Sequence, residues 1–380
     1  MKERQLTQET LNAICACRQA LPAEPRDASV VFGFDGVIDT NREIISERRN
    51  SDTYTTMRSL REFRENIDNT LASRSSMTEE WITTGKRIGG HVPHLSRAFG
   101  KLGLTVIAVG TFGHPPRKEF VKDIGEHTLI SVGEPSFCDA VEFDTEKLLL
   151  VEPGDSVNLS WEQMSKVVST ERLTGYIDGA DVLSTGYWAL IPDLPRVLHN
   201  LVEQRWNRME DPPKAIFIDT GDIRGLSEAE ASEGAELIST VNEQVPVILS
   251  GNRSEIEELA YVLAGTSTTD LERATQEAFS VLEINQVVGH GIDKSVAVTD
   301  EETSTVAVPM TESPAMTTSA GDHFNAGFVL GLIQNLPVPA RVVLGNAVAG
   351  CFVRTGTAPT YTEIKKFVDG YAGHFDESVQ

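Results

Sequence analysis

The sequence contains few cysteines and no long apolar run. Its four cysteines, Cys15, Cys17, Cys138 and Cys351, are scattered without a CxxC pair, which excludes a dense disulfide framework and argues against structural zinc. No segment approaches the roughly 18 consecutive apolar residues of a membrane span, and the polar start, MKERQLTQET, lacks the apolar run of a signal peptide. We therefore expect a cytoplasmic protein with reduced thiols and no membrane partner.

Basic residues are also scarce. The chain has 33 lysines and arginines against 56 aspartates and glutamates, which gives a formal net charge of −23 at pH 7. This balance argues against a general affinity for nucleic-acid phosphates. Only 11 of the cations are lysines and 22 are arginines. An acidic, lysine-poor surface suits a salty, halophile-like cytosol, in which ions screen self-repulsion, although an ordinary acidic protein is the alternative.

Apolar material is sufficient for a sizeable core, since 40% of the 380 residues are hydrophobic. Apolar, β-branched runs alternate with helical patterns from residues 28–39 onward, which predicts an α/β fold with a mostly parallel central sheet flanked by helices. No repeat or interdomain linker interrupts this order, so we expect residues 1–380 to form a single domain. Before the first strand, Leu11, Ile14 and Cys15 have helical spacing and predict an amphipathic helix over residues 7–20.

Two segments depart from the alternating pattern. Residues 51–80 are polar, with a helical stretch and a serine-rich patch, and they predict a helical insertion. Residues 137–151 contain two short extended runs separated by four polar positions, which predicts a β-hairpin standing apart from the main sheet, where it could form a lid.

The strongest chemical signal is the segment TTSAGDHFNAGFVLGL, residues 317–332. Small residues precede Asp322 and a predicted helix over residues 321–334, and the free amides and dipole of a helix start favour an anion such as a transferring phosphoryl group. A carboxylate beside it could accept the proton of an attacking hydroxyl. The structural alternative is an aspartate that merely stabilises the helix start.

A second signal is the segment GNRSEIEELA, in which Asn252 and Glu255 follow an apolar strand three positions apart. Their oxygen atoms could order water around Mg²⁺, which retains much of its hydration when bound. The alternative is a helix cap, with asparagine as the N-cap and glutamate three residues later.

A third signal lies at the end of the first strand. The segment GFDGVID places Asp35 and Asp39 there, and the pair Gly89 and Gly90 opens a helix about fifty residues later. Carboxylates and close glycine backbone at strand ends are suited to a polyhydroxylated substrate. Ordinary turn chemistry is the alternative, because aspartate and glycine are common in turns.

In this order, from about residue 30 to 365, these segments resemble the ribokinase superfamily, in particular the PfkB carbohydrate kinases. The family's di-glycine, NxxE and terminal GAGD-xF-xAGF motifs correspond to GGHVPHLSRAFGKLG, NRSE and SAGDHFNAGF, of which the last is the most specific. The resemblance implies a ribokinase-like fold and Mg²⁺-dependent transfer of the ATP γ-phosphoryl group to a hydroxyl of a sugar-like substrate. It also implies a small β lid formed by residues 40–50, 81–88 and 137–151.

The resemblance implies roles for individual residues. These roles are Asp322 as general base; the main-chain amides of Ser319, Ala320 and Gly321 as anion hole; Asn252 and Glu255 near Mg²⁺ through water; Asp39, Gly89 and Gly90 at the substrate; and Asn346 near the nucleotide base. Asp35, at the end of the same strand, is expected beside Asp39 at the substrate.

Several positions depart from the family pattern. Met316 and Ser319 stand where an acid and a glycine are usual, and His94 stands where asparagine is frequent after the di-glycine. His94 could donate to a hydroxyl or carboxylate of the substrate, with a packed structural histidine as the alternative. The segment IDTGDIRG matches a further family motif only loosely, so Asp219 and Arg224 are assigned no contact.

The sequence leaves two other functions open. KRIGG after a helical insertion is also similar to ADP-dependent sugar kinases, and the departures at positions 316, 319 and 94 would fit a non-catalytic sugar or nucleotide sensor. Retention of Asp322 and the NxxE pair favours an enzyme. Assistance by a monovalent cation and assembly as a homodimer are left open.

Overall fold

The computed structural model describes residues 6–144 and 146–375. Within these ranges nine strands form one sheet, in the spatial order β14 (Thr303–Ala307), β13 (Lys294–Val298), β12 (Gln286–His290), β11 (Val247–Asn252), β10 (Ile216–Asp219), β9 (Val182–Gly186), β1 (Val30–Phe34), β5 (Val106–Gly110) and β6 (Thr128–Ser131). All neighbours from β12 to β6 pair in parallel, and only the β12–β13 and β13–β14 pairs of this sheet are antiparallel. The predicted mostly parallel sheet is confirmed.

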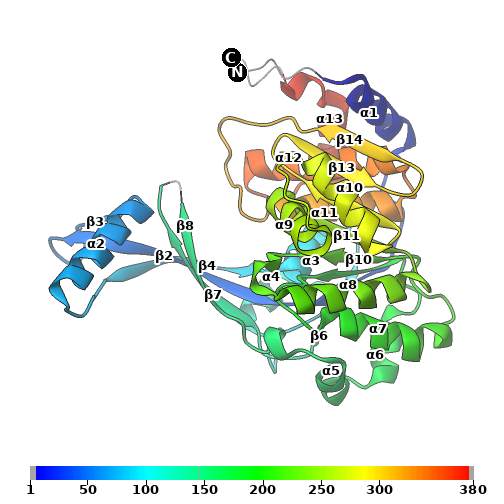
Figure 1. Cartoon of the computed structure of the whole chain (residues 1–380). Helices are drawn as coiled ribbons and strands as arrows, with labels where there is room; N and C mark the ends of the chain where they lie inside the picture. Colours follow the sequence, from blue (N-terminus) through cyan, green and yellow to red (C-terminus); the bar gives the residue numbers. More distant parts are fainter. Residues whose placement is uncertain (1–5, 145, 376–380) are drawn as a thin grey trace.

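Helices cover both faces of the main sheet (Figure 1). One face packs against α1 (Gln8–Ala20), α3 (His91–Lys101), α4 (Lys118–Ile124), α11 (Ala320–Ile333), α12 (Val338–Thr355) and α13 (Tyr361–Gly370). The other packs against α5 (Trp161–Val167), α6 (Thr170–Ile177), α7 (Leu194–Arg205), α8 (Glu228–Asn242), α9 (Arg253–Ala264) and α10 (Leu271–Leu282). Successive side chains of a strand point to opposite faces of the sheet. Val30 and Phe32 therefore pack in the core beneath the first group of helices, and Val31 packs in the core beneath the second group.

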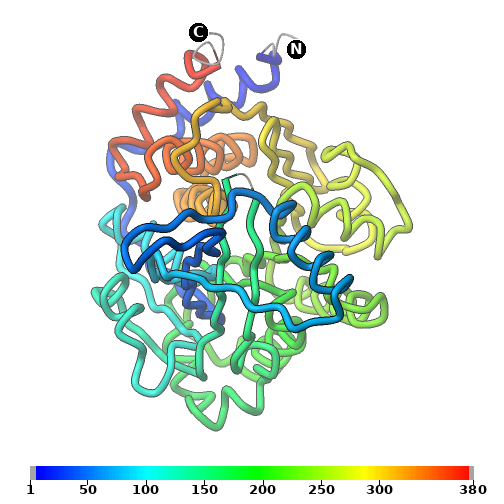
Figure 2. Tube along the Cα trace, turned by 90° about the vertical axis from the view of Figure 1, so that its left-hand side faces the viewer, coloured from blue at the N-terminus to red at the C-terminus, as the bar shows by residue number. Residues whose placement is uncertain are grey.

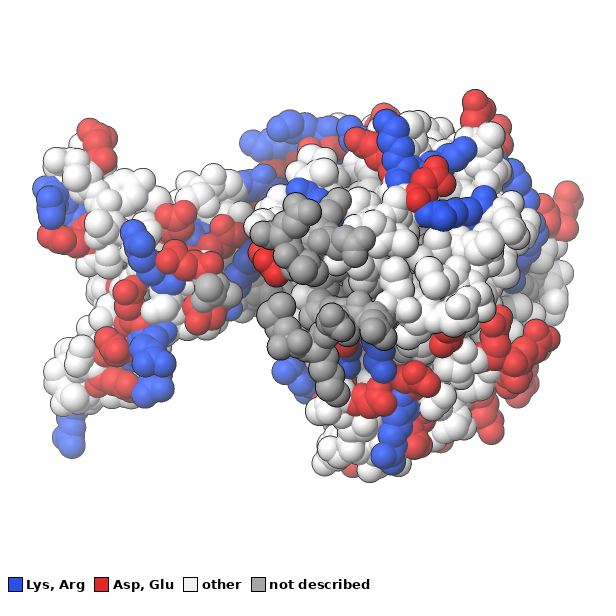
Figure 3. Space-filling view, turned by 90° about the horizontal axis from the view of Figure 1, so that it is seen from above, with Lys and Arg blue, Asp and Glu red and all other residues white. Residues whose placement is uncertain are grey.

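A second sheet projects from the main body. Among the described residues it consists of β3 (Tyr54–Thr56), β2 (Val37–Arg48), β7 (Ser136–Glu142) and β8 (Lys147–Glu152), with β4 (Trp81–Gly89) paired to β2. Helix α2 (Leu60–Ser73) and β3 lie at its far end, and Figures 2 and 3 show the sheet in front of the main body and standing out from it. Helix α2 lies within the segment predicted as an insertion, and β7 and β8 form an antiparallel pair where a hairpin is predicted. The insertion and the lid stay predictions.

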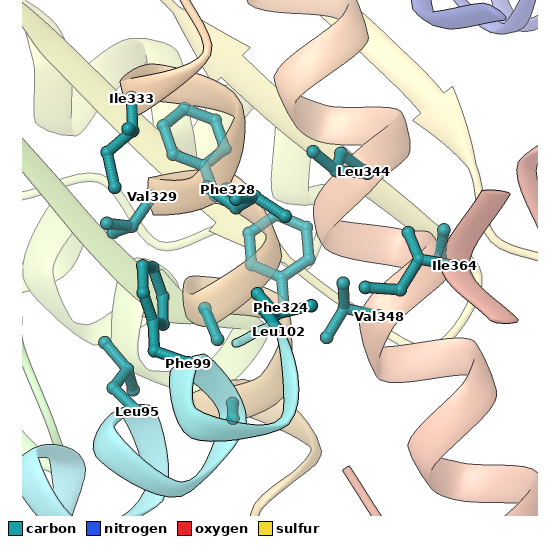
Figure 4. Packing of buried hydrophobic residues seen from close by; sticks show 14 of the residues in the cluster. Leu95, Phe99, Leu102, Phe324, Phe328, Val329, Ile333, Leu344, Val348 and Ile364 are labelled. Carbon is teal, nitrogen blue, oxygen red and sulfur yellow. The ribbon is translucent and has the colours of Figure 1, made fainter. Parts of the chain in front are cut away.

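Helix α11 is held in place by apolar packing on nearly all sides. Phe324 and Phe328 lie between Phe99 of α3 and Leu344 and Val348 of α12 (Figure 4). All five side chains are at most 3% exposed. Their burial fixes the start of α11 relative to the sheet, since moving the helix would open cavities in a closely packed core.

The N-terminal helix is confirmed, but its buried face differs from the prediction. Ile14 is buried as expected, whereas Leu11 is 40% exposed and Cys15 is exposed. Ala13 and Cys17 are buried instead, because α1 packs against α12 and β14 with the side that carries these two residues.

None of the helices in the described ranges has the length and apolarity needed to cross a membrane.

Candidate active site

Four parallel strands end at the edge of the main sheet where α11 begins. Asp35 follows β1, Tyr187 follows β9, Asp219 ends β10, and Asn252 ends β11. Carboxyl ends of parallel strands share one edge of a sheet, which is where α/β proteins bind ligands. The first turn of α11 brings Asp322 to the same place, and its side chain bonds to that of Tyr187.

Asp322 is the centre of this arrangement and is only 7% exposed. The Tyr187 hydroxyl donates to its Oδ1 atom at 2.6 Å. Burial and then the negative charge of Asp219 raise the pKa of Asp322 well above its usual value, while the bond from Tyr187 opposes this shift. A carboxylate with a raised pKa binds a proton more tightly than an ordinary aspartate, which is what a general base requires.

The start of α11 is accessible rather than packed inside. Thr317 is exposed, and Ser319, Ala320 and Gly321 are half-buried. The three residues predicted to form an anion hole therefore lie together beside Asp322 at a surface-facing helix start. In this structure the Ala320 amide donates to the Thr317 carbonyl at 3.2 Å, so this amide would have to leave that turn to bind an anion.

His94 lies beside the start of α11 and not on an open surface. It is 5% exposed, and its Nε2 atom is 2.8 Å from Ser319 Oγ and 4.0 Å from Asp322 Oδ2. Arg97 donates to His94 Nδ1 at 2.7 Å. Burial, followed by the nearby Arg97 charge, lowers the pKa of His94 well below its usual value, so the ring is neutral. The structure thus makes His94 a link between α3 and α11.

Asp35 stabilises the start of α3 from inside the protein. Its carboxylate accepts hydrogen bonds from the His91 and Val92 amides at 2.8 and 2.9 Å, and it has no exposed surface. Gly90 permits this approach, because its φ of +96° favours glycine and an added Cβ would lie 2.2 Å from Asp35 Oδ2. Burial raises the pKa of Asp35 to about 6. Asp35 thus caps α3 in this structure, and its substrate contact stays a prediction.

Asp39 and Gly89 lie close together on the paired strands β2 and β4, at the base of the second sheet. An added Cβ at Gly89 would be 2.7 Å from Asp39 Oδ2, so only glycine leaves room for this carboxylate. Arg87 Nε lies 3.7 Å from Asp39 Oδ2. Burial raises the pKa of Asp39, and the Arg87 charge opposes the shift. Asp39 keeps 18% of its side chain exposed and remains the better candidate of the two aspartates for a substrate contact.

Asn252 and Glu255 form the capping box that sequence reasoning held as the alternative. Asn252 Oδ1 accepts from the Ser254 and Glu255 amides, and Glu255 Oε2 accepts from the Asn252 amide at 2.6 Å. Burial and the charge of Asp219 raise the pKa of Glu255 to about 8. The cap does not decide the metal role, because it leaves Glu255 Oε1 outside the cap contacts.

Asn346, which is predicted to lie near the nucleotide base, is 2% exposed. Its Oδ1 accepts from Ser295 at 2.7 Å, and its Nδ2 donates to Tyr371 at 3.1 Å. Both ends of the amide join α12 to β13 and to the segment after α13, and a role near the nucleotide base stays a prediction.

Sequence reasoning missed two residues of the site, Tyr187 and Asp219. Asp219 accepts from Asn325 Nδ2 at 2.5 Å, and ligand atoms of His91, Asp219 and Asp322 lie within 4.8 Å of one another. The available signal was their position, because both residues stand at the carboxyl end of a buried strand.

Within the described chain, two surface hollows lie away from the Asp322 site, one beside α8 and α10 and one beside α1 and β14.

Solved structures with similar folds include an Arabidopsis thaliana ribokinase complexed with ribose and ATP (TM-score 0.60, 15% identity, 91% of this chain and 99% of that chain). Another is Escherichia coli phosphofructokinase-2 in complex with substrates and products (TM-score 0.59, 15% identity, 91% and 99%). These similarities define a ribokinase-like fold.

The chain belongs to the prokaryotic ketohexokinase family, whose model matches residues 6–371. A ketohexokinase of Haloferax volcanii is 42% identical over 367 residues, which cover 97% of this chain and 98% of that protein. The fold class, the family resemblance and the carbohydrate kinase function expected from the sequence are confirmed.

Proposed function

We propose that this kinase transfers the γ-phosphoryl group of ATP to a hydroxyl of a ketohexose, with Asp322 as general base. The observation that carries the proposal is the buried Asp322 carboxylate, held by Tyr187 at an accessible helix start where four strands end. The ketohexose assignment rests on the family and on the name of the relative with 42% identity. The comparisons favour neither an ADP-dependent kinase nor a non-catalytic sensor.

The chemistry follows from the placement of these groups. The sugar oxygen attacks the γ-phosphorus, the bond from that phosphorus to the β,γ-bridging oxygen breaks, and ADP leaves. The hydroxyl proton passes to Asp322, whose raised pKa favours its acceptance. The backbone amides at positions 319–321 and the α11 dipole would stabilise the charge on the transferring group.

The residues present fit a hydrated Mg²⁺ ion. Glu255, Asp219 and Asn252 offer the oxygen atoms that this ion prefers. Burial, followed by the charge of Asp219, raises the pKa of Glu255, and a nearby cation would oppose both effects. Glu255 would hold the ion through water, and the ion would neutralise triphosphate charge. A monovalent cation stays a prediction.

The second sheet is proposed as the substrate lid. Lys147 of β8 already reaches the segment before α11, where its Nζ atom donates to Thr318 Oγ1 at 2.8 Å. Arg87 of β4 approaches Met316 Sδ at 4.0 Å. A closed lid would exclude water, which otherwise competes with the sugar for the phosphoryl group. The exposed apolar side chains of Leu149, Leu150 and Val151 on β8 are compatible with a homodimer, which the sequence leaves open.

A coupled phosphorylation assay tests the proposal. ATP and ADP are compared as donors across ketohexoses, aldohexoses, pentoses and nucleosides, in high KCl with and without Mg²⁺. We expect turnover with ATP, Mg²⁺ and a ketohexose. Asp322→Asn should lower kcat about 10²- to 10⁴-fold while leaving the circular dichroism spectrum unchanged. Full activity of this variant would overturn the base assignment, and turnover with ADP alone would overturn the donor.

A further inference from the structure

Ser319 occupies a backbone conformation that serine rarely adopts. Its φ and ψ are +69° and 13°, in the left-handed region that favours glycine. Serine is a preferred N-cap residue, yet its side chain makes no capping hydrogen bond to α11. Instead, its Oγ atom lies 2.8 Å from His94 Nε2. Helix capping therefore does not explain this strained serine, and strain of this kind is concentrated at functional sites.

The partners of His94 fix the direction of the Ser319 hydroxyl. Arg97 contacts His94 Nδ1 at 2.7 Å, and a guanidinium can only donate, so Nδ1 must accept. The neutral ring then carries its proton on Nε2, which donates to Ser319 Oγ. Consequently the hydroxyl hydrogen of Ser319 is not used in this bond and is free to point elsewhere.

The remaining surroundings show where this hydrogen can act. Ser319 is half-buried and stands directly before Ala320 and Gly321, whose amides belong to the proposed anion hole. A hydroxyl here adds a side-chain donor to a group of main-chain donors. The Arg97 charge behind His94 polarises the two bonds toward an arriving anion.

We propose that the Ser319 hydroxyl donates a hydrogen bond to the transferring phosphoryl group and that Arg97 and His94 are positioning residues that orient it. This inference rests on the proposed phosphoryl transfer. It gives the serine that departs from the family pattern a role in stabilising transition-state charge.

Ser319→Gly tests the proposal against a purely structural contact. Glycine relaxes the left-handed backbone and keeps the amide, so it removes only the hydroxyl and its bond to His94. We expect a kcat about 10- to 100-fold lower, with the sugar KM changed less than about 3-fold and an unchanged melting temperature. Ser280→Ala, on the exposed side of α10, is the matched control. Native kcat, or a loss confined to the sugar KM, would overturn the proposal.

The orientation of the hydroxyl is tested separately by nuclear magnetic resonance. In protein labelled with ¹⁵N-histidine, the His94 shifts should show a protonated Nε2 and an unprotonated Nδ1, whereas the reverse tautomer would overturn the role of Arg97. Arg97→Met should lower kcat, and Arg97→Lys should recover part of it. If the native protein transfers no phosphoryl group, the proposed function fails, whereas a native enzyme matched by Ser319→Gly refutes only this inference.

Discussion

Tyr187 controls the base through a single hydrogen bond. Its hydroxyl donates to Asp322 Oδ1, and this bond lowers a pKa that burial and Asp219 raise. Tyr187→Phe removes this hydrogen bond and its lowering effect. The pKa of Asp322 should therefore rise, and the acid limb of the kcat/KM profile should move to higher pH. At pH 7 we expect kcat/KM to fall about 10- to 100-fold, since a hydrogen bond to a charged group contributes about 1.5–3 kcal/mol.

The pH profile of Tyr187→Phe is measured beside that of Tyr176→Phe. Tyr176 accepts from Arg172 on α6, outside the site, so its loss controls for removal of a phenolic hydroxyl. An acid limb at the native pH in Tyr187→Phe would show that the hydroxyl does not tune the base.

Asp219 raises the pKa of Asp322, whereas the hydrogen bond from Tyr187 lowers it. Its charge is the second-largest cause, after burial, of the raised pKa of Asp322. Asp219→Asn removes the charge and keeps an oxygen for the Gly221 amide, which now donates to Asp219 Oδ1 at 2.9 Å. The pKa of Asp322 should fall, moving the acid limb of kcat/KM to lower pH. A shift to higher pH, as expected for Tyr187→Phe, would contradict this electrostatic account.

At the scale of elements, strong local patterns were sufficient to place most of the structure. The helix predicted over residues 321–334 is α11, Ala320–Ile333, and the hairpin predicted over 137–151 is β7 and β8. Contacts distant in sequence could not be predicted in this way. Tyr187 meets Asp322 only because β9 and α11 share an edge, and Asp35 faces inward because the α3 amides hold it. The spacing of motifs along the sequence predicts neither the Tyr187–Asp322 contact nor the inward orientation of Asp35.

The contact between the second sheet and α11 depends on Lys147 of β8. Its bond to Thr318 Oγ1 joins the hairpin to the segment that leads into the proposed anion hole. Lys147→Met should loosen this closure, raising the sugar KM about 3- to 10-fold and increasing ATP hydrolysis without sugar, because an open lid admits water. Steady-state kinetics with and without sugar measure both effects. Lys122→Met on α4, an exposed residue, is the control, and equal kinetics in both variants would argue against a lid contact.

At the scale of the whole molecule, the charge of −23 sets the response to salt. Figure 3 shows acidic and basic side chains interspersed over the visible surface, so repulsion arises from the overall excess of acids rather than from one patch. Added salt weakens this repulsion and also weakens surface ion pairs, but each exposed pair contributes only about 0–1 kcal/mol. The net effect of salt should therefore be stabilising.

Thermal unfolding should accordingly occur roughly 5–10 °C lower in 50 mM KCl than in 2 M KCl, a shift that corresponds to about 4–8 kcal/mol for a chain of this size. Sucrose at matched osmolality controls for solvent exclusion, which stabilises without screening charge. A variant with four exposed acids neutralised lowers the negative charge by four and should show a smaller difference between the two salt concentrations; these acids are Glu243, Asp300, Glu301 and Glu312. If the native protein melts at the same temperature in both concentrations, its acidic surface is not an adaptation to salt, and its excess charge is too dispersed to matter for folding.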